Sequence, residues 1–357
     1  MRPVFAGPRA RLHFSNRWGA VSAHLCDVMV GRGVGEASVD VLSATRALFD
    51  GETMIDIPPG GSVTSDALDF DVLAGSDLVV TFFVAGTSGP AAGHASTGPS
   101  HGTLFLAAGN HAADSSGVDF GTPSIGTSFL VGLDVFVANE GVIVALGDSI
   151  TEGASSERAY SEILAERLRA RDATPRLSVV NAGIGGDAIS QLLPHRINDD
   201  VLGVTGVIGV VLMVGINDLG GGRGSLDPAS PEFVITGIED AVAQMERAGL
   251  VVWLSPLPPC GDADRPSLYV PHYSDPERIK RRHAINEWIR QSRWYDARVD
   301  FDEALVDPEH PEWIRADWSA DNLHPGTAGQ EAMAASVDLR VFDTAVGRAR
   351  PGGNPAL

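Results

Sequence analysis

Hydrophobic and polar residues alternate in short runs over about the first 135 residues of the chain. Such runs cover Arg11–Phe14, Ala20–Val30, Met54–Ile57 and Asp77–Val84, and glycine, proline and asparagine separate them. Period-two alternation between turn residues is typical of short antiparallel strands with one buried face. The stretch Thr87–Asn110, rich in Gly, Ala, Ser and His, predicts a long loop. The front of the chain therefore predicts a β-sandwich or jelly roll.

The pattern changes at Val142, where a continuous apolar run begins. A strand covered on both faces has such a run. Strand-like and helix-like segments then alternate, which predicts a parallel sheet with helices on both faces and an active site at the carboxyl ends of its strands. The predicted strands are Val142–Leu146, Leu177–Val180, Val207–Val214, Val251–Leu254 and Arg298–Phe301, and the predicted helices lie around Tyr160–Leu168, Glu232–Ala248, Pro276–Gln291 and Thr327–Leu339.

The length of 357 residues suits two domains, which we place at residues 1–139 and 140–357. Only Ala138–Gly141 separate the last β-like run, Ser128–Val137, from the strand at Val142. Four residues span roughly 13 Å when fully extended. We therefore expect the two domains to touch, without a flexible tether.

Composition narrows the classes of partner. The formal net charge of −20 argues against nucleic acid, whose phosphates would be repelled. No apolar run is long enough to predict a membrane span. Met1–Ala20 lack the apolar segment of a signal peptide, so the compartment stays open between the cytoplasm and secretion with a removed leader. Cys26 and Cys260 lack the spacing of a zinc site or a redox pair.

Four short segments that follow predicted strands or precede the last helix carry candidate chemistry. A serine on a tight turn, Ser149, follows the first strand, and a glycine-rich loop with Gly185 and Gly186 follows the second. Asn217 follows the most apolar strand, and Asp321 stands three residues before His324. Each segment alone also fits a turn or a cap. Together they offer a nucleophile, oxyanion donors and a carboxylate-oriented imidazole.

These segments, in this order, resemble blocks I, II, III and V of the SGNH (GDSL-like) hydrolases. The resemblance covers roughly Val142–Leu339 and implies a flavodoxin-like three-layer α/β/α catalytic domain. Gly186 takes the block II position because it immediately precedes Asp187. Block I reads G-D-S-I where G-D-S-L is the commoner form. The front half more loosely resembles the jelly-roll-like β-domain of two-domain bacterial SGNH esterases, some of which act on acetylated carbohydrates.

The resemblance implies a serine esterase that works through an acyl-enzyme and needs neither a metal nor an organic cofactor. Ser149 would be the nucleophile, His324 its base and Asp321 the residue that orients the imidazole. The backbone N–H groups of Ser149 and Gly186 and the side chain of Asn217 would form the oxyanion hole. The substrate would be a small-molecule or carbohydrate ester with a short, acetyl-like acyl group.

Substrate selection is expected in the segment Pro256–Asp275, which is long for a connection and carries Tyr269, His272 and Tyr273. A packed structural loop is the alternative for this segment. Asp148 is a further candidate for substrate contact. Three other functions stay open: an acyltransferase using the same serine, a short-chain lipase or arylesterase, and a binding protein on an inactive hydrolase scaffold. The sequence leaves the oligomeric state undetermined.

Overall fold

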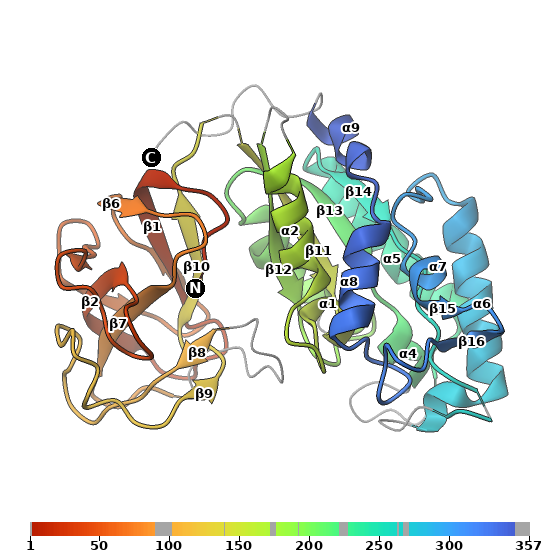
Figure 1. Ribbon diagram of the computed structural model, residues 1–357, viewed down its shortest axis with the longest axis horizontal. Coiled ribbons are helices and arrows are strands. Elements are labelled where there is room, and N and C mark those ends of the chain that lie inside the picture. The colour runs from red at the N-terminus through yellow and green to blue at the C-terminus, as the bar shows by residue number, and fades with distance from the viewer. Residues whose placement is uncertain are drawn as a thin grey trace. The chain divides into compact units, whose positions relative to one another are not determined.

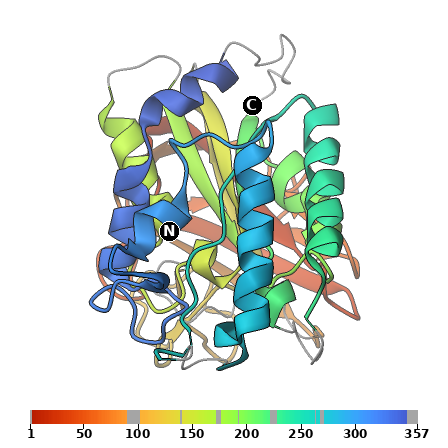
Figure 2. The same ribbon diagram turned by 90° about the vertical axis from the view of Figure 1, so that its right-hand side faces the viewer.

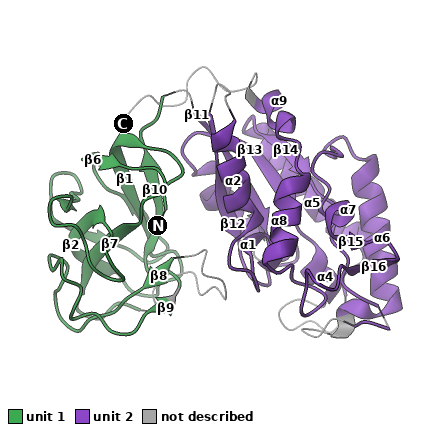
Figure 3. Cartoon of the chain, viewed as in Figure 1, with its two compact units in different colours: residues 1–138, 355–357 green, residues 139–354 purple. Residues whose placement is uncertain are grey.

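The computed structural model describes residues 2–89, 102–138, 140–171, 176–191, 193–220, 228–262, 264–266 and 271–346 (Figure 1). The chain divides into two compact units, with the boundary after residue 138 (Figure 3). Half of the predicted loop Thr87–Asn110, residues 90–101, lies outside the described residues.

Unit 1 contains two antiparallel four-stranded sheets and a two-stranded one. In the first large sheet β1 pairs with β10, β5 and β6, and in the second β2 pairs with β3, β4 and β7. The strands are β1 (Gly7–Ser15), β2 (Ala23–Arg32), β3 (Thr45–Arg46), β4 (Met54–Ile57), β5 (Ser62–Thr64), β6 (Leu68–Val72), β7 (Leu78–Ala85), β8 (Thr103–Leu104), β9 (Ser124–Ile125) and β10 (Leu130–Val135).

Alternation along β1 explains how the two large sheets share one core. Ala10, Leu12 and Phe14 are fully buried, while the residues between them are partly exposed. The Phe14 ring lies edge-on to Phe82 of β7, in the other sheet, with ring centroids 5.4 Å apart. The predicted strands at Arg11–Phe14, Met54–Ile57 and Asp77–Val84 are confirmed as parts of β1, β4 and β7.

Unit 2 is built on a parallel sheet in the order β12-β11-β13-β14, and the alternation of strands and helices in the sequence predicts such a sheet. The chain moves from β11 outward to β12, then crosses back to β13 and β14. The order thus reverses between β11 and β13, and in open α/β sheets ligands bind at the carboxyl ends of the strands at such a point. The strands are β11 (Glu140–Gly147), β12 (Arg176–Gly183), β13 (Val207–Met213) and β14 (Val251–Leu254).

Helices cover both faces of this sheet. In Figure 2, α2 and α8 lie on one side of the strands and α5 on the other. Helix α5 starts at Pro231 after Ser230, whose hydroxyl accepts the N–H of Phe233. The helical segments are α1 (Ser149–Glu152), α2 (Tyr160–Ala170), α3 (Leu193–Ile197), η2 (Asn198–Leu202), α4 (Ile216–Gly220), α5 (Pro231–Arg247), η3 (Pro271–Ser274), α6 (Pro276–Gln291), α7 (Phe301–Leu305), α8 (Thr327–Ser336), η4 (Leu339–Phe342) and α9 (Asp343–Val346).

The predicted strand at Arg298–Phe301 is wrong. Asp296 and Asp300 shape this region, since their carboxylates accept the N–H groups of Arg298 at 3.0 Å and Glu303 at 2.9 Å. The first contact makes a turn and the second caps α7, so local hydrogen bonds replace strand pairing. A hairpin that the pattern did not predict follows, formed by β15 (Val306–Asp307) and β16 (His310–Ile314). None of the helices in the described residues is both long and apolar enough to cross a membrane.

Candidate active site

Ser149 begins α1 directly after β11. The side chain of Asp148 accepts the N–H of Ile150 at 2.9 Å, which caps this short helix. Ser149 is half-buried, and its Oγ lies 2.9 Å from Nε2 of His324. Thus residues 175 positions apart in the chain form the contact that a serine nucleophile needs with its base.

His324 and Asp321 lie on one turn before α8. Nδ1 of His324 is 2.7 Å from Oδ2 of Asp321, while Oδ1 of the same carboxylate accepts the backbone N–H groups of Leu323 at 2.9 Å and His324 at 2.7 Å. Burial opposes ionisation of Asp321, but these hydrogen bonds outweigh it and lower its pKa to about 2. The carboxylate is therefore ionised at neutral pH and suited to hold a proton on Nδ1, leaving Nε2 to accept the serine proton.

The glycine loop after β12 is fastened to the neighbouring strands. The N–H of Ile184 donates to the carbonyl of Gly147 at 3.1 Å, and the N–H of Asp187 closes a turn onto Ile184 at 3.0 Å. Gly186 sits in this turn with φ +76°, a conformation that favours glycine. The loop is thereby held against the end of β11, close to Ser149.

Asn217, the second residue of α4, joins the same loop from β13. Its Nδ2 donates to the backbone carbonyl of Asp187 at 2.9 Å, and its Oδ1 accepts the hydroxyl of Tyr273 at 2.7 Å. The neighbouring Asp218 accepts the N–H groups of Ile189 and Ser190 at 3.0 and 2.9 Å. The ends of β11, β12 and β13 therefore meet through hydrogen bonds around one point.

Of the four residues predicted to contact the substrate, the structure describes the side chains of two. Asp148 is 1% exposed and Tyr273 is 5% exposed, and both side chains bond to groups of the site. Direct substrate contact by these two residues does not fit their burial. Tyr269 and the side chain of His272 lie outside the described residues.

Sequence reasoning missed a buried ion pair beneath the glycine loop. Arg196 of α3 is 2% exposed and contacts the carboxylate of Asp187, which is fully buried. Its Nε also donates to Asp200 at 2.7 Å, four residues further along the chain. The Arg196–Asp200 spacing is a helical one that the sequence displays, whereas the contact with Asp187 depends on how α3 returns to the loop.

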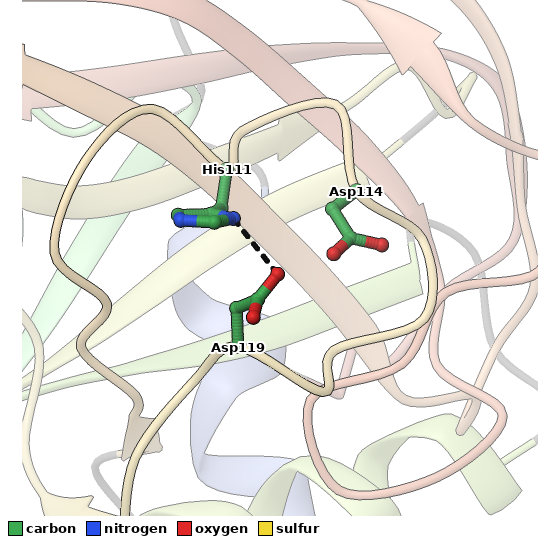
Figure 4. A group of neighbouring side chains, drawn as sticks. All are labelled: His111, Asp114 and Asp119. Atoms are coloured by element: carbon green, nitrogen blue, oxygen red, sulfur yellow. Dashed lines mark ion pairs between the residues drawn. The ribbon is translucent and has the colours of Figure 1, made fainter.

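Within the described residues, one group of three side chains could hold a metal ion, and it lies in unit 1. His111, Asp114 and Asp119 bring their ligand atoms within 4.8 Å of one another (Figure 4). Nδ1 of His111 pairs with Asp119 at 3.1 Å, and Asp114 accepts the hydroxyl and the N–H of Ser116. These contacts account for the cluster without an ion, and its residues belong to no part of the Ser149 site.

Comparisons with known proteins show the family of the chain. Residues 145–332 match the GDSL-like Lipase/Acylhydrolase family, and the chain belongs to this family. It is accordingly a carboxylic ester hydrolase of the GDSL/SGNH type. None of the curated proteins matches the chain.

Several solved structures are similar to this chain over more than half of its length. A lipase/acylhydrolase from Enterococcus faecalis is 24% identical, with 60% of this chain and 100% of that chain covered and a TM-score of 0.43. A GDSL-like lipase from Bacteroides thetaiotaomicron is 18% identical, with 59% and 89% covered and a TM-score of 0.42. A catalytic mutant of Axe2, an acetylxylan esterase from Geobacillus stearothermophilus, is 18% identical, with 59% and 94% covered and a TM-score of 0.41.

Proposed function

We propose that this protein hydrolyses short-chain carboxylic esters, acetyl esters above all, through Ser149, His324 and Asp321. The observation that carries the proposal is the unbroken hydrogen-bonded series from Ser149 Oγ to His324 Nε2 at 2.9 Å and from His324 Nδ1 to Asp321 at 2.7 Å. A hydroxyl, an imidazole and an ionised carboxylate in this order form the arrangement that activates serine for acyl transfer.

The first half of the reaction forms an acyl-enzyme. Ser149 Oγ attacks the ester carbonyl carbon while its proton passes to Nε2 of His324, and Asp321 stabilises the imidazolium. Collapse of the tetrahedral intermediate breaks the bond to the leaving alcohol, which takes the proton from Nε2. In the second half, water gives a proton to Nε2 and attacks the acyl carbon. Collapse of this second intermediate breaks the bond to Ser149 Oγ, which takes the proton back from Nε2, and the acid is released.

The negative charge of each tetrahedral intermediate needs donors that are already in place. We assign this role to the backbone N–H groups of Ser149 and Gly186 and to Nδ2 of Asn217. The loop geometry supports this assignment, because the hydrogen bonds of Ile184, Asp187 and Asn217 hold the ends of β11, β12 and β13 together. We further propose that unit 1 is a β-sandwich partner domain, since its two large sheets share one hydrophobic core.

Ester hydrolysis tests the proposal directly. The wild-type protein should hydrolyse p-nitrophenyl acetate faster than esters of longer acyl chains. Ser149→Ala should lose at least ~10³-fold in kcat, since the nucleophile has no substitute. An organophosphonate should add to Ser149 alone, as read by peptide mass. Ser336→Ala, an exposed serine at the end of α8, is the matched control and should keep full activity.

Three results would contradict parts of this assignment. Activity of Ser149→Ala at the wild-type level would remove Ser149 as nucleophile, and phosphonate on another serine would point to a different site. A product that forms faster with an added alcohol acceptor than with water would make the protein an acyltransferase. Absence of hydrolysis for every ester would favour a binding protein on an inactive scaffold.

A further inference from the structure

Tyr273 lies beside the proposed oxyanion hole without reaching the surface. It belongs to η3, the short segment before α6, and is 5% exposed. Its hydroxyl donates to Oδ1 of Asn217 at 2.7 Å, across 56 residues of the chain. We propose that Tyr273 is a positioning residue that fixes the amide of Asn217 in the orientation that presents Nδ2 to the oxyanion, an inference that rests on the proposed esterase function.

The two ends of the Asn217 amide are held by different partners. Nδ2 donates one hydrogen to the carbonyl of Asp187 at 2.9 Å, and Oδ1 accepts from Tyr273. With both bonds made, the amide plane is fixed and the second hydrogen of Nδ2 keeps one direction. A flipped amide would set Oδ1 against the Asp187 carbonyl, two acceptors facing each other. The Asp187 carbonyl thus disfavours the flipped amide, and the Tyr273 hydroxyl holds Oδ1 against smaller rotations. Both restraints matter because donors in an oxyanion hole act by being in place before the charge develops.

The residues around Tyr273 leave room for its ring and hold its backbone. A Cβ added to Gly220, at the end of α4, would lie 2.2 Å from ring atoms of Tyr273, so only glycine leaves room there. The carbonyl of Tyr273 accepts the thiol of Cys260 at 3.4 Å, and burial raises the pKa of that thiol to about 11, so it keeps its proton. The phenol is thus held by its backbone on one side and by the packing against α4 on the other.

Removal of the hydroxyl alone tests the inference. Tyr273→Phe keeps the ring and leaves Oδ1 of Asn217 without this buried donor. We expect kcat on p-nitrophenyl acetate to fall about 10-fold or more while KM changes less than about 3-fold, because the loss acts on the transition state. Asn217→Ala should cost roughly 10²–10³-fold. The double variant should be no slower than Asn217→Ala alone, since Tyr273 acts only through Asn217.

Two further variants separate positioning from general damage. Gly220→Ala pushes on the ring from α4 and should give the same fall in kcat with unchanged KM. Tyr295→Phe is the matched control, because it removes a hydroxyl that bonds to Asp300 at 3.0 Å, away from the Ser149 site, and should leave kcat unchanged. A Tyr273→Phe enzyme with wild-type kcat, or one whose loss adds fully to that of Asn217→Ala, would overturn the inference.

A readout that needs no turnover distinguishes this inference from the esterase proposal. With selectively ¹⁵N-labelled asparagine, the side-chain amide signal of Asn217, assigned from its absence in Asn217→Ala, should shift or broaden in Tyr273→Phe and stay unchanged in Tyr295→Phe. An unmoved signal in Tyr273→Phe would refute the positioning role even in an active enzyme. A moved signal in a protein that hydrolyses no ester would support the contact while the esterase proposal fails.

Discussion

Asp148, next to the proposed nucleophile Ser149, carries one hydrogen-bonded oxygen and one that has no hydrogen-bond partner among the described residues. Burial raises the pKa of this carboxyl to about 7, although the N–H of Ile150 and the nearby His324 favour the ionised form. The carboxyl group beside the proposed nucleophile therefore changes charge near neutral pH.

This shift predicts how stability depends on pH. Because the folded pKa lies above the unfolded value near 4, the native state holds an extra proton between these two values, and stability falls as pH rises from about 4 to 7. The raised pKa corresponds to a loss of at most ~4 kcal/mol in the free energy of unfolding across that range. In Asp148→Asn this contribution should be lost, so the fall in stability between pH 5 and pH 8, as measured by urea unfolding, should be smaller than in the wild-type protein. Asp240→Asn, an exposed change on α5, should keep the wild-type slope; an unchanged slope in Asp148→Asn would refute the assignment.

At the scale of elements, the sequence predicts what local pattern and capping determine. The strand Val251–Leu254 and the helix Pro276–Gln291 agree with the structure to the residue, because an apolar run defines the first and Asp275 with Pro276 marks the start of the second. The predicted strand at Arg298–Phe301 failed because two aspartates cap local N–H groups there. Helix content and sheet direction follow from such signals.

The sequence pattern does not predict contacts between distant elements. Candidate triad residues could be recognised because they stand in short motifs at strand or helix ends. The Tyr273–Asn217 hydrogen bond and the Arg196–Asp187 pair have no local pattern, since each depends on how a loop or helix returns to the sheet. The sequence predicts Tyr273 near the substrate, whereas its proposed positioning role follows only from the direction of its hydroxyl.

The pair between α3 and the glycine loop makes a prediction at the same scale. Arg196→Met would leave the buried carboxylate of Asp187 without its cation. We expect the free energy of unfolding, measured in urea, to fall by ~3–5 kcal/mol. Activity should fall as well, because the backbone carbonyl of Asp187 accepts the hydrogen bond from the side-chain amide of Asn217. Asp187→Asn combined with Arg196→Met removes the uncompensated charge and should recover part of the lost stability. Equal losses in the single and double variants would show that the charge is not the cause.

At the scale of the whole molecule, each unit has a hydrophobic core of its own. The core of unit 1 draws on residues between Ala10 and Phe129, and that of unit 2 on residues between Ile143 and Ala345. Ser149, Gly186, Asn217, Asp321 and His324 all belong to unit 2. Two cores and one self-contained set of reactive groups mean that the chemistry and the role of the β-unit can be tested separately.

The last prediction concerns a shortened chain that begins at Glu140. It should unfold cooperatively and keep activity on p-nitrophenyl acetate close to that of the full chain, because every proposed catalytic group lies beyond that point. The four-residue connection Ala138–Gly141 predicts that the units touch, so removal of unit 1 should expose surface and lower the unfolding temperature of unit 2 by several degrees. Calorimetry of the full and shortened chains measures this difference. An unchanged unfolding temperature would refute the predicted contact, whereas activity lost only on acetylated polysaccharides would show that unit 1 helps to bind polymeric substrates.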